Sequence, residues 1–340
     1  MRLVQLESKG ERRVAIVQEP ELLLLQEPSS MYALALRSLT QQTAFTELAT
    51  SLLSDERLPY DDVYGGTSPW LLLAPIDVPD EPQRMLISGT GLTHLGSARE
   101  RQAMHAAAGT APEEVDETAM TDSMRMFAWG QKDGRPSDGA VGVAPEWFYK
   151  GDGSVVRGPF EALPIPGHAE DGGEEAEVAM VYVVDANGTP HRIGMTTGNE
   201  FSDHVFERKN YLNLAGSKLR CCSLGPELVV GEPFDDVPGT VRVKRGGTTL
   251  WEKSIRTGEA NMAHSLANME HHHFKFAGHR QAGTVHVHFL GADALSFGQG
   301  IRLQAGDVTE VAFEGFGRAL HNTIEVEPAM NAPVRVTAMR

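Results

Sequence analysis

Residues 171–200 have the sequence DGGEEAEVAMVYVVDANGTPHRIGMTTGNE. The apolar run at 178–184 is typical of a buried strand, and Asn187-Gly188 is a strong signal for a short hairpin loop. The stretch therefore predicts two antiparallel strands. If Asn187 and Gly188 are the two loop residues, the pairing places Glu175 opposite Glu200. A β-bulge in either strand would break this register.

Three carboxylates would meet at one end of this hairpin. Glu175 and Glu177 are two residues apart, so their side chains share one face of an extended strand, and the return strand adds Glu200. Like charges held this close disfavour joint ionisation unless a cation lies between them. Three oxygen ligands with positions left for water suit Mg²⁺ or Mn²⁺. The competing interpretation is a solvated acidic edge, which leaves the return of a third carboxylate unexplained.

The composition is that of an ordinary folded protein with an acidic surface. The 340 residues are 41% hydrophobic and 22% charged, which is enough to bury a core without disulfides. The formal net charge of -16 repels nucleic acid and anionic membrane surfaces. It also slows an anionic substrate, an effect that a bound divalent cation would offset. We therefore expect a small-molecule partner and neither nucleic acid nor membrane.

Cysteine usage and the N-terminus predict a cytoplasmic protein. The two cysteines, Cys221 and Cys222, are adjacent and too few for a secreted disulfide framework. The N-terminal residues lack a basic region followed by an apolar run, and no segment of the sequence approaches the roughly 20 apolar residues of a membrane span. Glycine motifs for nucleotide phosphates are also absent from the sequence.

Residues 1–80 are expected to form a small N-terminal α+β domain. Alternating apolar residues predict a hairpin within 2–17, and the apolar spacing after Ser30 predicts one amphipathic helix over 31–53. A loop through Pro59 should follow.

Residues 81–340 are expected to form a β-rich catalytic domain. The sequence predicts a helix, a loop and a helix between Gln102 and Met126, and two further helical segments over 201–215 and 263–275. The other strands are expected at 155–164, 177–185, 227–231, 240–245, 284–290, 307–313 and 323–328.

The motifs around the carboxylates resemble the core of the fumarylacetoacetate hydrolase superfamily. Glu175-Ala176-Glu177 and a hydrophobic strand are followed by Gly198-Asn199-Glu200, then by Ser217-Lys218 and Gly225-Pro226. The resemblance covers roughly 70–330 and includes the glycine-led loop with His94 and the aromatic segment before Lys150. Residues 198–231 are most similar to the GguC-like branch and to the 2-keto-3-deoxypentonate (2-keto-3-deoxyarabinonate) dehydratases.

The resemblance implies an α+β fold with a rolled, mixed β-sheet, usually in a homodimer or a higher homo-oligomer. It implies one divalent metal per subunit, Mg²⁺ or Mn²⁺, held by Glu175, Glu177 and Glu200. The residues that it implies for catalysis are Lys218, Ser217 and His94, and those for substrate binding are Lys150, Asp203 and Gly291.

Two positions depart from the superfamily pattern. Glu200 stands where relatives usually have aspartate, which lengthens this ligand by one methylene. Ala292 stands where many relatives carry a threonine that contacts substrate, so no hydroxyl is available there.

The expected reaction is the dehydration of a 2-keto-3-deoxy sugar acid. A metal that chelates the carboxylate and keto oxygens makes the C3 proton more acidic. Lys218 is the expected base, because a desolvated lysine near a divalent cation has a lowered pKa and is then partly neutral. The alternative interpretation of Lys218 is a surface lysine in a polar loop.

Three other functions remain open on the sequence. A carbon–carbon bond hydrolase of a 2,4-dioxo acid would need a histidine to activate water, and His94 is the counterpart. His271-His272-His273 with His286 and His288 offer a rival metal site of the kind found in cupin-like barrels. A sugar-acid-binding protein on a retired catalytic fold is the non-enzymatic hypothesis, which Glu200 and Ala292 support.

Overall fold

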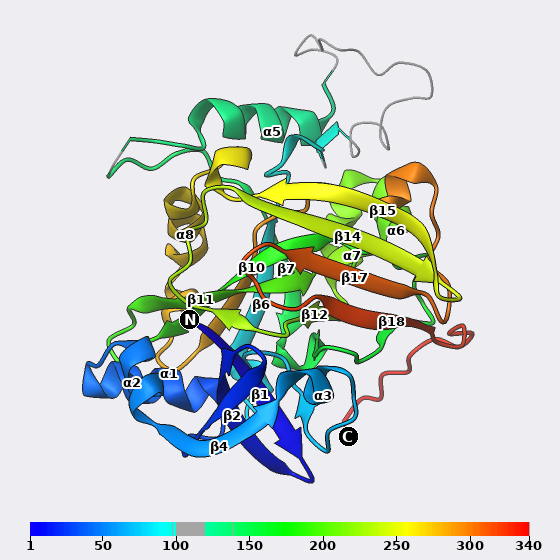
Figure 1. The fold of residues 1–340 in the computed structure, drawn as a ribbon. Coiled ribbons are helices and arrows are strands. Elements are labelled where there is room, and N and C mark those ends of the chain that lie inside the picture. The colour runs from blue at the N-terminus through cyan, green and yellow to red at the C-terminus, as the bar shows by residue number, and fades with distance from the viewer. Residues whose placement is uncertain (97, 100–119, 138, 340) are drawn as a thin grey trace.

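The protein folds around two β-sheets that pack against each other, as the computed structural model shows (Figure 1). The structure describes residues 1–96, 98–99, 120–137 and 139–339. The expected helix beginning at Gln102 and most of the loop after it lie outside the described residues. The expected α+β class with mixed sheets is confirmed, because the large sheet contains both parallel and antiparallel pairs.

The large sheet runs from the N-terminal strands to the middle of the chain. Its central path has the order β4-β3-β2-β1-β13-β11-β10-β16-β6-β7, with β5, β8 and β12 paired beside it. Its strands are β1 (Arg2–Ser8), β2 (Glu11–Gln18), β3 (Glu21–Leu25), β4 (Leu53–Pro59), β5 (Leu71–Leu72), β6 (Met85–Gly91), β7 (Glu146–Asp152), β8 (Val156–Arg157), β10 (Ala176–Val184), β11 (Pro190–Asn199), β12 (Cys222–Leu224), β13 (Leu228–Val229) and β16 (Val285–Phe289).

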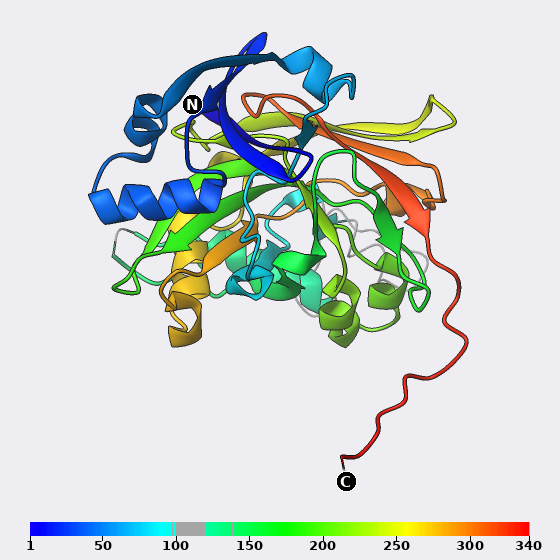
Figure 2. The same ribbon diagram turned by 90° about the horizontal axis from the view of Figure 1, so that it is seen from below.

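The second sheet has the order β15-β14-β17-β18-β9 and lies across one face of the large sheet (Figure 1). Its strands are β9 (Leu163–Ile165), β14 (Val237–Arg245), β15 (Thr248–Thr257), β17 (Val308–Phe313) and β18 (Leu320–Val326). The chain after β18 leaves the body as an extended segment (Figure 2).

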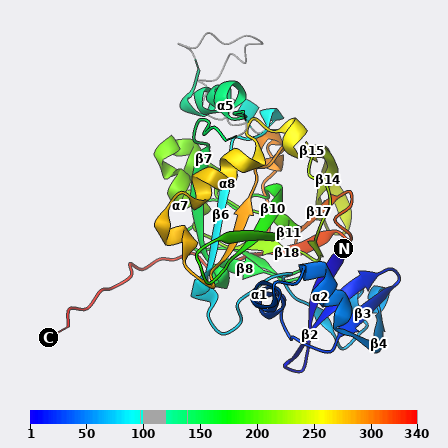
Figure 3. The same ribbon diagram turned by 90° about the vertical axis from the view of Figure 1, so that its left-hand side faces the viewer.

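Helices surround the sheets (Figure 3), and α1 packs against one face of the large sheet. They are α1 (Met31–Gln41), α2 (Phe45–Ser51), α3 (Tyr60–Tyr64), α5 (Asp122–Asp133), α6 (His204–Lys209), α7 (Leu214–Lys218) and α8 (Leu266–Phe274). None of the helices in the described part of the chain is both long enough and apolar enough to cross a membrane.

Strand β10 is almost continuously apolar after Glu177 because both of its faces are buried. All nine of its residues are buried. Met180 belongs to a core shared with Val241 and Val311 of the second sheet. Val181, on the opposite face, belongs to a core shared with Leu34 of α1. A strand covered on both faces loses the alternation of apolar and polar residues that marks a half-exposed strand.

The hairpin of β10 and β11 has the predicted register at its far end, but by a different route. The loop has three residues, Ala186 to Gly188, because the Asp185 amide donates to the carbonyl of Thr189. A β-bulge at Ile193 then adds one residue to β11. The longer loop and the bulge cancel, so Glu177 pairs with Gly198 as the two-residue loop predicted. The two-residue loop was therefore wrong, whereas the bulge does shift the register by one residue, as expected.

The N-terminal elements agree with the sequence in part. The hairpin of β1 and β2 is confirmed, and Ser30 caps α1 by accepting from the amide of Ala33. The single helix predicted over 31–53 was wrong, because Gln42 adopts a left-handed conformation and separates α1 from α2. The segment expected to be a loop through Pro59 contains β4 and α3. Strand β1 pairs with β13, so the N-terminal strands extend the large sheet.

The C-terminal predictions were mostly confirmed. Strands β10, β14, β16, β17 and β18 and helices α6, α7 and α8 overlap their predicted segments. The strand predicted over 155–164 was wrong, since only Val156–Arg157 and Leu163–Ile165 are extended there. Strands β7 and β15 were missed, and β7 is important because it borders the site described next.

Candidate metal centre

Glu175, Glu177 and Glu200 converge at one end of the β10–β11 hairpin. Carboxylate oxygens of the three residues lie within 4.8 Å of one another, and all three side chains are buried. They form the one such group found among the described histidine, cysteine, aspartate and glutamate residues. The predicted convergence of these three carboxylates is therefore confirmed.

Backbone pairing fixes this convergence. The Glu200 amide donates to the carbonyl of Glu175 at 2.9 Å, so the two residues leave adjacent strands at the same level. Gly198, opposite Glu177, faces the ring of Phe289, and a Cβ there would lie 2.5 Å from the ring. Because Gly198 has no side chain, the Phe289 ring can pack against the backbone beside the carboxylates.

Two cationic groups contact Glu175. Its Oε1 accepts from Lys218 Nζ at 2.6 Å and lies 3.0 Å from His204 Nε2. Burial acts to raise the pKa of Glu175, but the charges of Lys218 and His204 outweigh it and hold that pKa well below its usual range. Glu175 is therefore ionised at neutral pH.

Glu177 has a different environment. Its Oε2 accepts the backbone N–H of Gly291 at 2.6 Å. Burial, reinforced by the charges of Glu200 and Glu175, raises the pKa of Glu177 well above its usual range. The raised pKa means that the charged form of Glu177 is disfavoured in this buried position, which a neighbouring cation would reverse.

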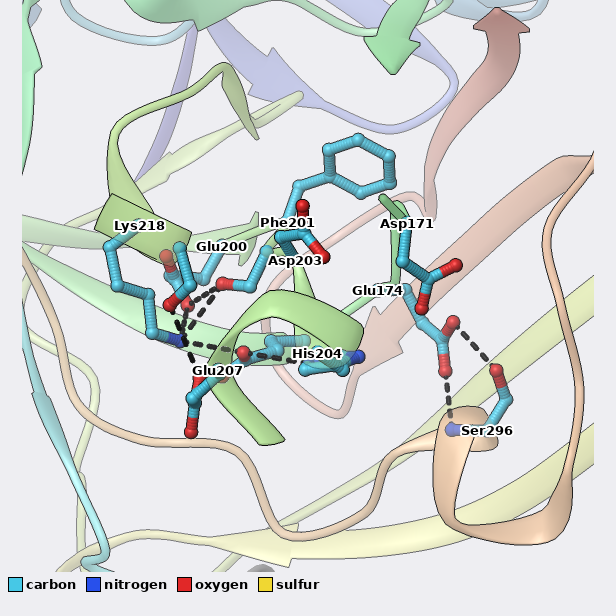
Figure 4. Close-up of polar contacts among 12 residues, drawn as sticks. Asp171, Glu174, Glu200, Phe201, Asp203, His204, Glu207, Lys218 and Ser296 are labelled. Carbon is cyan, nitrogen blue, oxygen red and sulfur yellow. Dashed lines mark hydrogen bonds and ion pairs between the residues drawn. The ribbon is translucent and has the colours of Figure 1, made fainter. Parts of the chain in front are cut away.

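Glu200 is the most extensively bonded of the three. Its Oε1 accepts from Lys150 Nζ, and its Oε2 accepts from Ser202 Oγ at 2.8 Å. Its Oε2 also accepts from Lys218 Nζ (Figure 4). These bonds fix the Glu200 side chain, which is one methylene longer than the aspartate expected at this position from the resemblance.

The donor set fits a hard divalent cation. The group offers oxygen ligands from three carboxylates, which suit Mg²⁺ or Mn²⁺, and no sulfur. The raised pKa of buried Glu177 indicates that a further positive charge would be favourable at this point. Glu175, Glu177 and Glu200 are the residues that would hold the ion.

Glu174 shows that adjacency in sequence does not make a ligand. Its carboxylate accepts from the backbone N–H of Ser296 at 2.7 Å and from the Ser296 hydroxyl at 2.8 Å (Figure 4). It points away from the cluster and anchors the turn at Ser296–Gln299. Glu174 therefore has a structural role.

The predicted catalytic residues occupy three different settings. Lys218 Nζ lies directly against Glu175 and Glu200. Ser217 Oγ donates to the carbonyl of Leu214 at 2.7 Å, within α7. His94 contacts the hydroxyls of Thr93 and Thr257, and burial lowers the pKa of His94 to about 4.

The predicted substrate-binding residues are engaged with the protein itself. Asp203 caps α6 by accepting from the Phe206 amide and also accepts from Arg220. The N–H of Gly291 is used by Glu177, and Lys150 bonds Glu200. Each of these groups positions other residues in this structure.

His204 and Ser202 were missed by the sequence analysis. His204 is 1% exposed, and a Cβ at Gly173 would lie 2.3 Å from its Nδ1, so the glycine makes room for the ring. Burial opposes the charged ring, but the bond to Glu175 prevails and raises the pKa of His204. The available signal was the segment GNEFSDH, which returns a histidine one turn after Glu200.

The histidine cluster is a hydrogen-bonded network. His273 Nε2 lies 2.9 Å from His286 Nδ1, and the Trp147 indole donates to His273 Nδ1 at 3.1 Å. His288 lies between the hydroxyls of Ser88 and Thr90. The described histidines do not form a metal-binding group, so the rival metal site was wrong.

Comparisons with known proteins give one similar sequence and several similar structures. No protein-family model matches the chain. A probable 2-keto-3-deoxyxylonate dehydratase of Haloferax volcanii is 28% identical over 185 residues, which cover 53% of this chain. The match spans 60% of that relative's own length.

Solved structures match over almost the whole chain. A 2-keto-3-deoxyarabinonate dehydratase is 19% identical, with a TM-score of 0.68, and the match covers 96% of this chain and 99% of that one. The fold is that of the 2-keto-3-deoxyarabinonate dehydratases. A structure of 2-keto-3-deoxy-D-arabinonate dehydratase complexed with magnesium and 2,5-dioxopentanoate is 18% identical, with a TM-score of 0.67, and covers 96% and 100% of the two chains.

A more distant likeness extends to an isomerase. The 5-carboxymethyl-2-hydroxymuconate delta-isomerase of Mycobacterium smegmatis is 18% identical, with a TM-score of 0.58 and coverage of 96% and 99%. Together these matches show that the chain shares its fold with 2-keto-3-deoxyarabinonate dehydratases and, more distantly, with this isomerase.

Proposed function

We propose that this protein is a Mg²⁺-dependent lyase that dehydrates a 2-keto-3-deoxy sugar acid, converting a 2-keto-3-deoxypentonate to 2,5-dioxopentanoate. The observation that carries the proposal is the contact of Lys218 with the buried cluster of Glu175, Glu177 and Glu200. The dehydratase names of the relatives support it. Mn²⁺ is the alternative ion, since it accepts the same oxygen ligands.

Lys218 is the proposed base. Bound Mg²⁺ would act as a Lewis acid that makes the C3 proton of a 2-oxo acid more acidic. Lys218 is 0% exposed, and its Nζ lies 4.7 Å from the centre of the Phe148 ring, so water has little access to the amine. A neutral amine there would accept the C3 proton, and the C4 hydroxyl would take up a proton and leave as water, which forms a double bond between C3 and C4. Loss of a C5 proton and return of a proton to C3 would then give the enol of the 5-aldehyde, which tautomerises to 2,5-dioxopentanoate.

The hydrolase alternative is less well supported. Activation of water requires a base that accepts a proton near neutral pH. The lowered pKa of about 4 makes His94 a weak base, and its ring lies between two threonine hydroxyls. A carbon–carbon bond hydrolase would need another residue for this step.

The test is turnover of 2-keto-3-deoxy aldonates with Mg²⁺, together with exchange of the C3 hydrogens in deuterated water. We expect both in the parent protein, and Lys218→Met to lower both by about 10²- to 10⁴-fold, the usual contribution of a positioned base. Lys209→Met is the matched control, because Lys209 is exposed on nearby α6 and pairs with Glu170.

Two results would contradict the proposal. If sugar acids stabilise the protein against heat without turnover, the protein is a binding protein rather than an enzyme. If Lys218→Met exchanges C3 hydrogens as fast as the parent, another residue is the base. We further propose that the protein is cytoplasmic and forms a homodimer or a higher homo-oligomer. Light scattering of the purified protein would test the oligomeric state.

A further inference from the structure

Lys150 occupies a β-bulge at the border of the metal centre. Strand β7 pairs with β6 through Tyr149 opposite Ser88 and Gly151 opposite Ile87, so Lys150 is the extra residue between two paired positions. A bulge redirects the side chain that it carries. Lys150 is 1% exposed, whereas its neighbour Tyr149 is 41% exposed.

The Lys150 ammonium uses all of its hydrogen-bonding capacity on the protein. It donates to Glu200 Oε1, to the carbonyl of Phe201 at 2.9 Å and to the carbonyl of Lys218 at 3.0 Å. An ammonium has three donors and no acceptor. With all three donors engaged, Lys150 has none left for a substrate oxygen.

These three acceptors belong to two segments that must be held together. Glu200 and Phe201 follow β11, and Phe201 has a left-handed backbone conformation with φ of 48°, which a non-glycine residue adopts only when its surroundings enforce it. Lys218 ends α7. One side chain therefore fixes a proposed metal ligand, the strained residue after it and the backbone of the proposed base.

We propose that Lys150 is a positioning residue, which sets the place of Glu200 in the metal centre and of Lys218 beside it, and that it does not bind substrate. The inference rests on the proposed function, because it concerns the ligands of the proposed metal. It replaces the substrate-binding role that the sequence resemblance implied for Lys150.

The test separates metal affinity from substrate affinity. Mn²⁺ binding to the full-length protein is followed by electron paramagnetic resonance, and oxalate, a bidentate mimic of a 2-oxo acid, is then titrated at saturating Mn²⁺. For Lys150→Met we expect Mn²⁺ affinity to fall by about 10- to 100-fold, the usual effect of losing a partner of a metal ligand. Oxalate affinity at saturating Mn²⁺ should change less than about 3-fold, and KM should be similarly unaffected while kcat falls.

Lys150→Gln provides a second variant if Lys150→Met does not fold. The glutamine keeps one amide donor near Glu200 but removes the charge, so Mn²⁺ affinity should again fall while oxalate affinity is kept. Lys209→Met, the exposed lysine on α6, should leave both affinities unchanged.

Two outcomes overturn the inference in different ways. If either Lys150 variant binds Mn²⁺ as the parent does but loses oxalate affinity, Lys150 is a substrate ligand and only this inference fails. If the parent protein itself binds no Mn²⁺ and turns over no 2-keto-3-deoxy acid, the proposed function fails, and the inference with it.

Discussion

The amide of Glu200 donates a 2.9 Å hydrogen bond to the carbonyl of Glu175, and this one contact sets the geometry of the metal centre. Because paired residues of adjacent strands lie close together, the two carboxylates start from neighbouring backbone positions. Glu177 lies two residues after Glu175, so its side chain shares the same face and completes the group. The centre is therefore built on a hairpin inside a sheet, which is a more rigid support than a loop.

The first prediction concerns the neighbours Glu174 and Glu177. Glu177→Gln keeps the size of the side chain but removes a ligand charge, so we expect Mn²⁺ affinity to fall at least about 100-fold and turnover to be lost. Glu174→Gln is the matched control, because Glu174 is also buried but bonds only Ser296 among the contacts described above.

Glu174→Gln should bind Mn²⁺ normally and lose about 1–3 kcal/mol of unfolding free energy, because an amide donor would face the donors of Ser296. Calorimetric Mn²⁺ titration and urea unfolding measure the two quantities. Equal loss of Mn²⁺ affinity in both variants would show that the site does not depend on Glu177 in particular.

The second prediction concerns metal removal. Each sheet face has its own apolar core, so the fold should survive chelation with unchanged far-ultraviolet circular dichroism while turnover stops. Mg²⁺ at 100 times its Kd should raise the free energy of unfolding by about 2.7 kcal/mol, because it binds only the folded state. Glu177→Gln should show no such gain. Unfolding on chelation would instead show that the metal is structural.

The carboxylate cluster was predictable because it depends on local rules. Alternation along a strand places Glu175 and Glu177 on one face, and a strong turn signal returns Glu200 to them. The correct register, however, arose from two compensating features that were not foreseen. The loop is one residue longer than predicted, and the bulge at Ile193 restores the pairing.

Other parts of the site depend on tertiary contacts that local patterns do not contain. The three acceptors of Lys150 come from segments 50 to 68 residues away in the chain. The bond from the Gly291 amide to Glu177 spans 114 residues. Strand β7 was missed because its pattern is inverted: Glu146 and Lys150 are buried, whereas Trp147 and Tyr149 are exposed.

The third prediction concerns Gly291, whose amide holds Glu177. Its φ is +98°, and a Cβ would lie 1.9 Å from Thr93 Oγ1. Gly291→Ala should therefore cost about 2–4 kcal/mol of unfolding free energy and weaken Mn²⁺ binding by displacing the amide. Gly300→Ala is the control, since Gly300 has a φ of +78° but open space around its Cα.

Gly300→Ala should lower the free energy of unfolding by about 1 kcal/mol and leave Mn²⁺ affinity unchanged. It introduces the same kind of backbone strain as Gly291→Ala but no steric clash. Urea unfolding and Mn²⁺ titration of both variants provide the comparison. If Gly291→Ala binds Mn²⁺ with the parent affinity, the Gly291 amide does not determine the position of Glu177.

The fourth prediction concerns acid stability and His288. Burial, with smaller effects from neighbouring histidines, lowers the pKa of His288 to about 3. The folded protein therefore keeps this ring neutral, whereas the unfolded chain binds a proton below its usual pKa of 6.5. The stabilising effect is complete above pH 6.5 and is lost as the pH falls towards 3. His286 has a similarly lowered pKa of about 3 and acts in the same direction.

His204 changes the pH dependence of stability in the opposite direction, because its pKa is raised. The effect of one histidine is therefore isolated by substituting that residue alone. Between pH 6.5 and 5.5, each buried neutral histidine should cost the folded state about 1 kcal/mol. His288→Gln should remove that share of the pH dependence, although its unfolding free energy at pH 7.5 also falls. His271→Gln, at an exposed position of α8, is the control and should keep the parent slope. The measurement is urea unfolding at pH 7.5, 6.5 and 5.5, and identical slopes in the parent and His288→Gln would show that His288 takes up its proton in the folded state.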